Sequence, residues 1–395
     1  MIVLIFRCIL LCLCALNFFL SAAVLNGIQF ILRLILRPFS PWAYRKINYY
    51  LTYSIFANVV FLCYWWSGSV LRLYVKKSQL EPLGKETAIL VMNHTWEVDW
   101  IFSWVVCDYF KILGNAKCYA KTMLKYVPVI GWTWTLSDFV FLQRDWDRDK
   151  EVIARSLRNL LSYADPVWML IFAEGTRFTP EKHAQSVEVA KRKGLPIFKN
   201  VLLPRVRGCL ATVQEFKKGD VPALYDCTVM FDEVNGNKAT LKNLLLGRRI
   251  ICDLLVERLP LKEVPDTLET CTAWINELFA KKDSNMEYYK THNNNYDLDF
   301  NEYQVIVMTG RFSGFFLIMF WLYFVTIPFC QFILGLISGV TAALITLAIL
   351  SGLTAVALYK LTGLTKVSQA SSYGKAKGTS TGEAKVVSNG SGVSH

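Results

Sequence analysis

Three long stretches without a charged residue stand out along the chain. They cover residues 8–32, 47–71 and 312–359. A helix needs about 20 apolar residues to cross a bilayer, so each stretch is long enough for at least one crossing. The third is long enough for two, and Pro328 and Gly335 predict that it folds back as a hairpin. We therefore expect N-terminal membrane segments within residues 1–80 and a C-terminal transmembrane hairpin over residues 312–360.

The region between these stretches alternates short apolar runs with helical spacing. Unbroken apolar runs at 87–92 and 166–173 are typical of strands buried on both faces. Further candidate strands are residues 138–142, 201–206, 224–230 and 249–256. Apolar side chains recur at helical spacing over 149–163 and 267–280. The pattern predicts an α/β domain over residues 81–282, with a mixed sheet flanked by helices.

The two remaining segments are polar. Residues 283–311 include Asn293, Asn294 and Asn295, and we expect them to form a polar linker. Residues 361–395 are rich in Ser, Gly, Thr and Lys, a composition that buries too little apolar surface to fold. We expect this basic tail to be disordered and assign it no part in catalysis.

Composition and charge agree with a membrane protein whose soluble part faces a reducing compartment. Hydrophobic residues make up 53% of the chain, and the eleven cysteines include no CxxC pair that would indicate a disulfide framework or a zinc site. The net charge of +12 is spread along the chain, which suits anionic lipid headgroups and phosphorylated ligands better than nucleic acid.

Basic residues follow both N-terminal apolar stretches, so the positive-inside rule places both flanks in the cytosol. Two full crossings cannot satisfy this arrangement. Either one segment enters a single leaflet, or the pair forms a shallow hairpin.

The segment VMNHTWEVDW, residues 91–100, places His94 at the end of a predicted strand. On a regular helix Asp99 would lie about 140° away from it, so the chain must turn for the two side chains to meet. Asp99 would then fall in the first turn of the next helix and accept from Nδ1, leaving Nε2 to take a proton. This arrangement describes a general base, although a histidine at a strand end is often only a hydrogen-bonded core residue.

No GxSxG motif is present, and no serine or cysteine adjoins His94 in sequence as an obvious nucleophile. The proton that His94 would take therefore comes from a substrate hydroxyl rather than from a residue of the protein.

A second polar turn, IFAEGTRFTP at residues 171–180, also follows an apolar strand. Gly175 allows a tight turn, Arg177 offers a planar fork for a phosphate, and Glu174 is placed to orient that arginine. An ordinary surface arginine in a strand-ending turn is the alternative. Two such turns in one domain are stronger evidence than either alone.

Further basic residues follow other predicted elements. They are Lys121, Lys125, Arg144, Arg205 and Arg207. Each alone is most simply a solvated surface charge. If the strands are neighbours, some of these side chains gather beside His94 and Arg177 in a pocket suited to a phosphomonoester.

Four short blocks occur in a fixed order along the chain. They are Asn93-His94-x4-Asp99, Phe141-x2-Arg144, Glu174-Gly175-Thr176-Arg177 and Leu203-Pro204-Arg205. In this order the chain resembles the glycerolipid acyltransferase family, specifically the eukaryotic 1-acylglycerol-3-phosphate (lysophosphatidic acid) acyltransferases. The likeness runs from about residue 25 through the C-terminal hydrophobic hairpin. Four ordered blocks are far more specific than any one of them.

The resemblance implies a role for each block. His94 is then the base and Asp99 its partner. The implied substrate-binding residues are Glu174, Gly175, Thr176 and Arg177 at the acceptor phosphate, with Arg144, Lys121 and Arg205 as further candidates.

The resemblance also implies a reaction. Acyl-CoA is the implied acyl donor, lysophosphatidic acid the acceptor, and phosphatidic acid for phospholipid and triacylglycerol synthesis the product. The implied location is the endoplasmic reticulum membrane, with the catalytic domain facing the cytosol. We expect neither a cofactor nor a metal, because a thioester is already activated and needs mainly a base and good alignment.

Three alternatives stay open. The acceptor could be another lysophospholipid, as in remodelling. A metallohydrolase could use His94, Asp99 and Glu174, although a chain with four histidines offers few ligands. The domain could also be a non-catalytic lipid-binding membrane scaffold.

Overall fold

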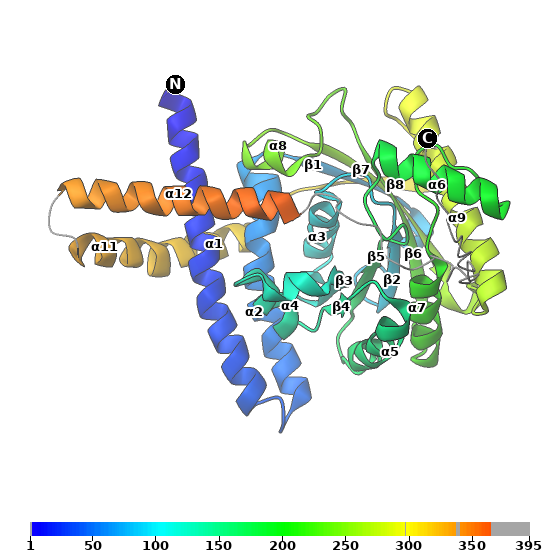
Figure 1. Cartoon of the computed structure of the whole chain (residues 1–395), viewed down its shortest axis with the longest axis horizontal. Coiled ribbons are helices and arrows are strands. Elements are labelled where there is room, and N and C mark those ends of the chain that lie inside the picture. The colour runs from blue at the N-terminus through cyan, green and yellow to red at the C-terminus, as the bar shows by residue number, and fades with distance from the viewer. Residues whose placement is uncertain (1, 297, 337–339, 365–395) are drawn as a thin grey trace, which may run out of the picture.

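The computed structural model describes residues 2–296, 298–336 and 340–364. Within these residues, eight strands form one mixed sheet in the order β4-β3-β5-β2-β6-β7-β1-β8, with helices packed around it (Figure 1). The strands are β1 Val70–Lys76, β2 Ala88–Met92, β3 Ala116–Lys121, β4 Val140–Leu142, β5 Trp168–Ile171, β6 Ala223–Phe231, β7 Ile251–Pro260 and β8 Tyr303–Met308. The predicted fold class is therefore confirmed.

Parallel pairing brings the functional turns to one edge of the sheet. Strands β4, β3, β5, β2 and β6 run parallel, and Ala88 of β2 stands opposite Trp168 of β5 and Ala223 of β6. Strand β7 is antiparallel to β6 and parallel to β1, and β8 is antiparallel to β1. The carboxyl ends of β2 and β5 thus lie side by side, at the edge where ligands bind in open α/β sheets.

Five of the six strands predicted from apolar runs are confirmed. Strands β2, β4, β5, β6 and β7 fall within or overlap the predicted ranges. The sixth prediction, at residues 201–206, is wrong. There the backbone N–H groups of Leu202 and Leu203 donate to the side chains of Glu174 and Ser186 instead of to a neighbouring strand.

Two apolar layers cover the sheet. Leu90 of β2 packs in the layer that includes Phe56 and Phe102, whereas Ile89 and Val91 face the opposite layer. This alternation explains why β2 reads as an unbroken apolar run. The helices are α1 Ile2–Ile35, α2 Pro41–Phe61, α3 Asp99–Tyr109, α4 Ile130–Leu136, α5 Trp146–Leu161, α6 Pro180–Lys193, α7 Val206–Lys218, α8 Leu241–Leu245, α9 Leu268–Thr291, α10 Phe312–Trp321, α11 Ile327–Leu336 and α12 Val340–Leu364.

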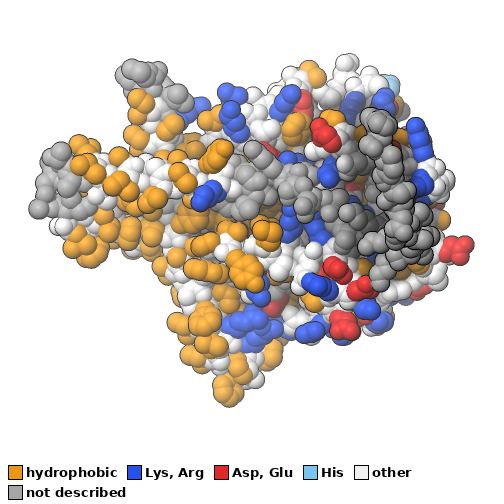
Figure 2. All heavy atoms as spheres, in the orientation of Figure 1, with side chains coloured by type: hydrophobic (Ala, Val, Ile, Leu, Met, Phe, Trp, Pro, Cys, Tyr) orange, Lys and Arg blue, Asp and Glu red, His pale blue; other side chains and the backbone are white. Residues whose placement is uncertain are grey.

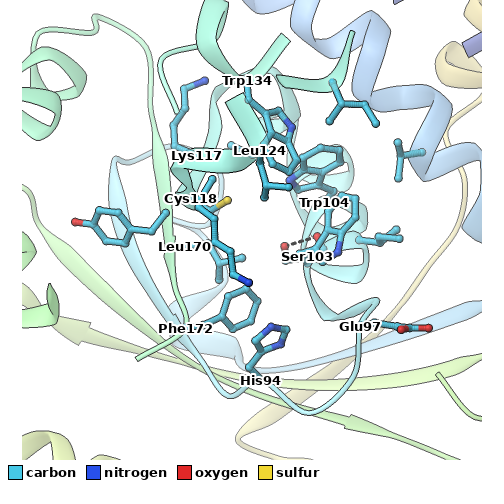
Figure 3. A pocket seen from close by; sticks show the side chains of 18 of the residues that line it. His94, Glu97, Ser103, Trp104, Lys117, Cys118, Leu124, Trp134, Leu170 and Phe172 are labelled. Carbon is cyan, nitrogen blue, oxygen red and sulfur yellow. Dashed lines mark hydrogen bonds between the residues drawn. The ribbon is translucent and has the colours of Figure 1, made fainter. Parts of the chain in front are cut away.

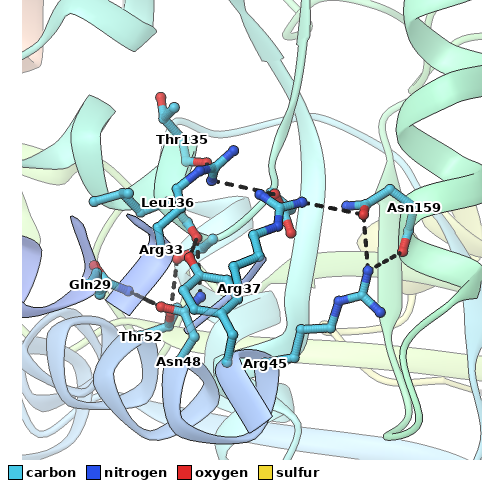
Figure 4. A network of polar contacts seen from close by, with 12 residues as sticks. Gln29, Arg33, Arg37, Arg45, Asn48, Thr52, Thr135, Leu136 and Asn159 are labelled. Carbon is cyan, nitrogen blue, oxygen red and sulfur yellow. Dashed lines mark hydrogen bonds and ion pairs between the residues drawn. The ribbon is translucent and has the colours of Figure 1, made fainter. Parts of the chain in front are cut away.

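The second uncharged stretch, residues 47–71, does not form one continuous helix. Helix α2 ends at Phe61 and β1 begins at Val70. Polar side chains of α2 point inward, where the Gln29 amide of α1 donates to Asn48 Oδ1 at 2.8 Å and to Thr52 Oγ1 at 3.1 Å (Figure 4). Buried polar groups need hydrogen-bond partners, and these hydrogen bonds hold α2 against α1.

In the described part of the chain, two helical segments are long and apolar enough to cross a membrane, Ile5–Ile35 and Phe312–Leu336. A shorter apolar helical segment, Leu344–Lys360 within α12, follows residues 337–339, and the C-terminal transmembrane hairpin stays a prediction. Figure 2 shows apolar side chains covering the left of the molecule, where these apolar helices lie, while charged side chains gather over the sheet domain on the right.

The prediction of a polar linker over residues 283–311 is wrong for residues 283–291 and 303–308. Helix α9 continues to Thr291 with Met286 and Tyr289 buried, and β8 pairs with β1, placing Val305 opposite Tyr74. Buried side chains at helical spacing and a short edge strand therefore replace a loose connection. The tail expected to be disordered starts at residue 361, but residues 361–364 belong to the end of α12. The rest of this tail, residues 365–395, lies outside the described residues.

Candidate active site

Two strand-ending turns meet at one edge of the sheet. Strand β2 ends at Met92 and its neighbour β5 ends at Ile171. The turn after β2 carries His94, and the turn after β5 carries Arg177. The backbone N–H of Phe178 donates to the carbonyl oxygen of His94 at 2.8 Å and ties the turns together.

His94 and Asp99 form a hydrogen-bonded pair. Nδ1 of His94 lies 3.0 Å from Oδ2 of Asp99. The same oxygen accepts from the backbone N–H groups of Thr95 and Trp96, at 2.7 Å and 2.9 Å. The turn therefore wraps around the carboxylate of Asp99, which is the first residue of α3, as predicted. Because Nδ1 faces this carboxylate, Nε2 is the ring nitrogen that can accept a proton.

The pair lies at a boundary between the protein interior and a cavity. The side chain of Asp99 is fully buried, whereas that of His94 is 20% exposed and stacks on Phe172 with ring centres 4.1 Å apart. Burial raises the pKa of Asp99, while His94 and the two backbone N–H groups oppose the shift. Among the described residues, nothing hydrogen-bonds to Oδ1 of Asp99. The interactions of this carboxylate are thus concentrated on the oxygen that holds the imidazole.

Glu174 supports His94 rather than Arg177. Oε1 of Glu174 accepts from the backbone N–H of His94 at 2.7 Å, and Oε2 accepts from that of Leu202 at 2.9 Å. Burial raises the pKa of Glu174 to about 8, although both N–H groups lower it. The expectation that Glu174 orients Arg177 is therefore wrong, since its carboxyl group lies beneath the turn and fixes the backbone of His94.

Gly175 occupies a position that a side chain would not fit. Its φ is +69°, and a Cβ there would lie 2.8 Å from Cδ of Arg205. The backbone N–H of Arg205 donates to the carbonyl oxygen of Ala173 at 2.7 Å, which holds Arg205 against this turn. Thr176 is buried in the same turn and lines the cavity beside His94.

Arg177 pairs with a residue that the sequence did not single out. Its NH1 lies 3.3 Å from Oε2 of Glu97, and Oε1 of Glu97 accepts from the backbone N–H of Leu241 at 2.6 Å. Sequence reasoning missed Glu97 because Arg177 lies 80 residues away along the chain. Its place two residues before Asp99, in the same turn, was the one available signal.

Lys121, Arg144 and Arg205 form a basic cluster. Burial lowers the pKa of Lys121, and the charge of Arg144 lowers it further. The same two causes lower the pKa of Arg205. The turn that carries Arg144 has a positive φ of 67° there and donates three backbone N–H groups to the carboxylate of Asp149. These cations line one cavity together with His94 and Arg177, whereas Lys125 and Arg207 are exposed elsewhere.

This cavity has a volume of about 480 Å³. Figure 3 shows His94 and Phe172 at one end of it, and Trp104, Leu124 and Trp134 farther along. Most other lining side chains are apolar, and four of the helices contribute Phe18 from α1, Val59 from α2, Ile318 from α10 and Leu358 from α12. Cations near one end and apolar walls elsewhere suit a ligand with an anionic head and a long hydrocarbon chain.

Comparison with known proteins identifies the family. A family model described as Acyltransferase matches residues 74–227, and one described as Acyltransferase C-terminus matches residues 243–321. The 1-acyl-sn-glycerol-3-phosphate acyltransferase delta of Homo sapiens is 36% identical over 361 residues, which cover 90% of this chain and 92% of that protein. The chain belongs to the eukaryotic 1-acyl-sn-glycerol-3-phosphate acyltransferase family.

This acyltransferase also matches a second relative and a solved structure. The gamma protein of Homo sapiens is 34% identical over 359 residues, which cover 90% of this chain and 93% of that protein. The crystal structure of the 1-acyl-sn-glycerophosphate (LPA) acyltransferase PlsC from Thermotoga maritima covers 71% of this chain and 97% of its own, with 16% identity and a TM-score of 0.39. The family model and the two Homo sapiens relatives confirm the resemblance inferred from the four ordered blocks.

Within the described ranges, the acyltransferase has no group of three or more His, Cys, Asp or Glu side chains that could hold a metal ion. His94, Asp99 and Glu174 lie near one another, but Glu174 faces backbone N–H groups with both oxygens. This set of side chains does not form a metal site.

Proposed function

We propose that this acyltransferase transfers the acyl group of acyl-CoA to the sn-2 hydroxyl of lysophosphatidic acid, giving phosphatidic acid and free coenzyme A. The observation that carries the proposal is the His94–Asp99 pair beside cations in a mostly apolar cavity. The names of the delta and gamma relatives support this acceptor.

The reaction follows from the geometry of the pair. Nε2 of His94 takes the proton of the acceptor hydroxyl, whose oxygen attacks the thioester carbonyl carbon. The tetrahedral intermediate collapses, the carbon–sulfur bond breaks, and the leaving thiolate receives the proton from the imidazolium. Asp99 stabilises that imidazolium through Nδ1 and keeps the ring in the productive orientation.

The basic residues of the cavity supply the charge that both substrates require. The acceptor carries one phosphate group, and coenzyme A carries several. Arg177 offers a planar fork for bidentate contact with a phosphate, and Lys121, Arg144 and Arg205 add positive charge to the same cavity. In this proposal Arg177 binds the phosphate of the acceptor.

The apolar part of the cavity accounts for the long chains of both substrates. It reaches α1, α10 and α12, which include the helical segments long and apolar enough to enter a membrane. A lysolipid in the bilayer would therefore meet the cavity from the membrane side. We infer that the sheet domain faces the cytosol, because basic residues follow both N-terminal apolar stretches. The endoplasmic reticulum membrane is proposed as the location from the resemblance to the eukaryotic family.

A transfer assay on the purified full-length chain tests this proposal. Labelled acyl-CoA is supplied with lysophosphatidic acid, or with other lysophospholipids, in the presence and absence of a chelator. We expect equal amounts of phosphatidic acid and free thiol, with turnover unchanged by the chelator. Failure to acylate lysophosphatidic acid, or complete loss of activity with the chelator, would contradict the proposal.

A further inference from the structure

A second cavity lies beside helices α5 and α7, which pack together (Figure 1). It has a volume of about 410 Å³ and lies between the start of α5 and one side of α7. Its lining includes Trp146, Asp147, Arg207, Gln214 and Leu268. None of these five residues lines the first cavity, so a ligand bound here would occupy separate space.

The two cavities come close to each other at two points along the chain. Arg144 lines the first cavity and Trp146 lines the second, while Arg205 and Arg207 are divided in the same way. Two residues of chain span at most about 7 Å, so the basic cluster of the first cavity lies next to the second. The guanidinium of Arg207 also lies over the ring of Trp146, 5.9 Å from its centre, which brings the two points together. An extended ligand with one end at His94 can therefore pass this cluster and enter the second cavity.

The lining of the second cavity suits a flat, neutral ring. The indole of Trp146 is half-buried against an apolar layer of the domain, and nucleobases of every kind can stack on such a side chain. The charges of Asp147 and Arg207 balance, so the cavity has no excess positive charge of the kind that the first cavity has. The carboxylate of Asp147 and the amide of Gln214 can accept from the exocyclic amino group of a base. Adenine has both the flat ring and the amino group.

Coenzyme A has a matching order of groups. Its thioester end is joined by a long pantetheine arm and a diphosphate to an adenosine that carries a 3′-phosphate. We propose that the second cavity binds the adenosine end of acyl-CoA, with adenine stacked on Trp146 and the 3′-phosphate at Arg207. The diphosphate then lies at Arg144 and Arg205, between the two cavities. The inference rests on the proposed use of acyl-CoA and adds to it the site that holds the nucleotide.

A regulatory nucleotide site in the same cavity makes a different prediction. A regulatory nucleotide would act without sharing space with the donor, so adenosine 3′,5′-bisphosphate would leave the KM for acyl-CoA unchanged. In our proposal this compound inhibits acyl transfer by competing with acyl-CoA, and it does not compete with lysophosphatidic acid. Inhibition that acyl-CoA cannot overcome, or no inhibition, would overturn the proposal.

The first test measures equilibrium binding of labelled coenzyme A to purified full-length wild type and Trp146→Leu. Leucine keeps an apolar side chain against the domain but removes the ring on which adenine would stack. We expect the Kd for coenzyme A to rise about tenfold, as for other bases that lose an aromatic partner. Trp132→Leu removes an exposed tryptophan of α4 that lines neither cavity, and it should leave the Kd unchanged. Equal Kd values for wild type and Trp146→Leu would overturn the proposal.

Arg207→Gln tests the phosphate end of the ligand and keeps the proposal testable should Trp146→Leu fail to fold. Arg207 is exposed, so the variant should fold. We expect weaker binding of coenzyme A but unchanged binding of 3′-dephospho-coenzyme A, which lacks the phosphate assigned to this arginine. Arg155→Gln, at an exposed position of α5 outside both cavities, is the matched control. An equal loss for both ligands, or no loss for either, would overturn the assignment.

Transfer rates with a shortened donor separate a nucleotide site from a general structural effect. S-acyl-4′-phosphopantetheine keeps the thioester and the arm but lacks the adenosine. In Trp146→Leu the KM for acyl-CoA should rise, while kcat and the KM for the shortened donor stay at their wild-type values. Equal increases in KM for the two donors would contradict the proposal.

The outcomes also distinguish this inference from the proposed function. If wild type transfers the acyl group but Trp146→Leu and Arg207→Gln bind coenzyme A as tightly as wild type does, the nucleotide site is overturned and the proposed function stands. If wild type binds coenzyme A but transfers no acyl group from acyl-CoA, the proposed function fails, and the Kd values of the variants still decide the nucleotide site. If wild type binds no coenzyme A, both fail.

Discussion

Asp99 and Asp253 are both completely buried, yet their surroundings differ in kind. Asp99 accepts from the imidazole of His94 and from two backbone N–H groups. Asp253, on β7, accepts from the guanidinium of Arg72 on the neighbouring strand β1 and from the hydroxyl of Tyr289 on α9. One carboxylate faces a group that can gain and lose a proton, and the other faces a permanent cation.

The partner of the carboxylate, rather than its burial, distinguishes the candidate active site from a structural ion pair. Arg72 stays charged at every accessible pH, so its contact with Asp253 can only hold β1, β7 and α9 together. His94 lines a cavity, and an imidazole, unlike a guanidinium, can both gain and lose a proton in a reaction. A buried carboxylate therefore indicates catalysis only when its partner can both exchange a proton and reach a substrate.

Among the variants that test this difference, Asp99→Asn should have the largest effect, which is a loss of kcat. An amide cannot stabilise the imidazolium or fix the tautomer, so kcat should fall about 10²- to 10⁴-fold, while the KM values for both substrates change little. Steady-state rates of acyl transfer measure this. Asp165→Asn, which removes a partly exposed carboxylate paired with Lys46, is the matched control and should retain wild-type rates. A similar rate for Asp99→Asn and the control would remove Asp99 from the mechanism.

The comparison predicts a loss of stability, and not of chemistry, for Arg72→Ala. The variant leaves Asp253 buried without its cation, and the free energy of unfolding should fall by about 3–5 kcal/mol. Denaturant titration in detergent measures the change. Arg158→Ala removes a mostly exposed arginine paired with Glu215, and it should cost less than about 1 kcal/mol. If Arg72→Ala is as stable as wild type, or if its folded fraction loses turnover, the proposed difference between Asp99 and Asp253 is contradicted.

A second arginine–carboxylate pair should behave differently from the pair on β1 and β7. Arg177 faces the cavity, so Arg177→Ala should raise the KM for lysophosphatidic acid about tenfold or more, with the KM for acyl-CoA within about twofold of wild type. Varying one substrate at saturating levels of the other separates the two constants. Arg192→Ala, at the exposed end of α6, provides the control. Equal increases in both KM values would contradict the placement of the acceptor phosphate at Arg177.

The most gradual expected effect concerns Glu174, a buried carboxyl group that accepts from the backbone N–H groups of His94 and Leu202. Its pKa is raised from 4.5 to about 8 by burial, so the folded protein binds this proton more tightly than the unfolded chain. The resulting stabilisation is complete below pH 4.5 and is lost as the pH rises toward 8. Relative to Glu174→Gln, the free energy of unfolding of the wild type should fall by at most about 1.4 kcal/mol per pH unit across this range. A difference that stays constant, or grows with pH, would show that Glu174 is ionised when folded.

Much of the sheet could be predicted, because strands buried on both faces read as apolar runs. AILVM of β2 and ALYDCTVMF of β6 are of this kind. Strand β3, AKCYAK, could not be found in this way, since its Lys117 is buried and Lys121 lines the cavity. Strand β8 lies in a segment whose polar composition resembled a linker, and only its pairing with β1 defines it.

The contact between His94 and Asp99 could be predicted because the two residues lie five positions apart, within reach of one turn. Contacts between the turns that follow two different strands could not be predicted. The spacing of residues along the chain does not show which strands are neighbours in the sheet. Glu174 was placed in the correct turn but given the wrong partner, and the pairing of Glu97 with Arg177 was missed. Both contacts join the turns after β2 and β5 and depend on the adjacency of those strands.

The proposed mechanism depends on His94 acting as the base of the acyl transfer. The most direct measurement compares the turnover of His94→Ala and wild type, with labelled acyl-CoA and lysophosphatidic acid, at equal concentrations of folded protein. The variant should still fold, because the backbone contacts of residue 94 to Glu174 and Phe178 remain and Asp99 keeps its two backbone N–H donors. We predict that the rate of phosphatidic acid formation falls at least about 10³-fold, from the loss of base catalysis. Equal turnover of the two proteins would contradict the account.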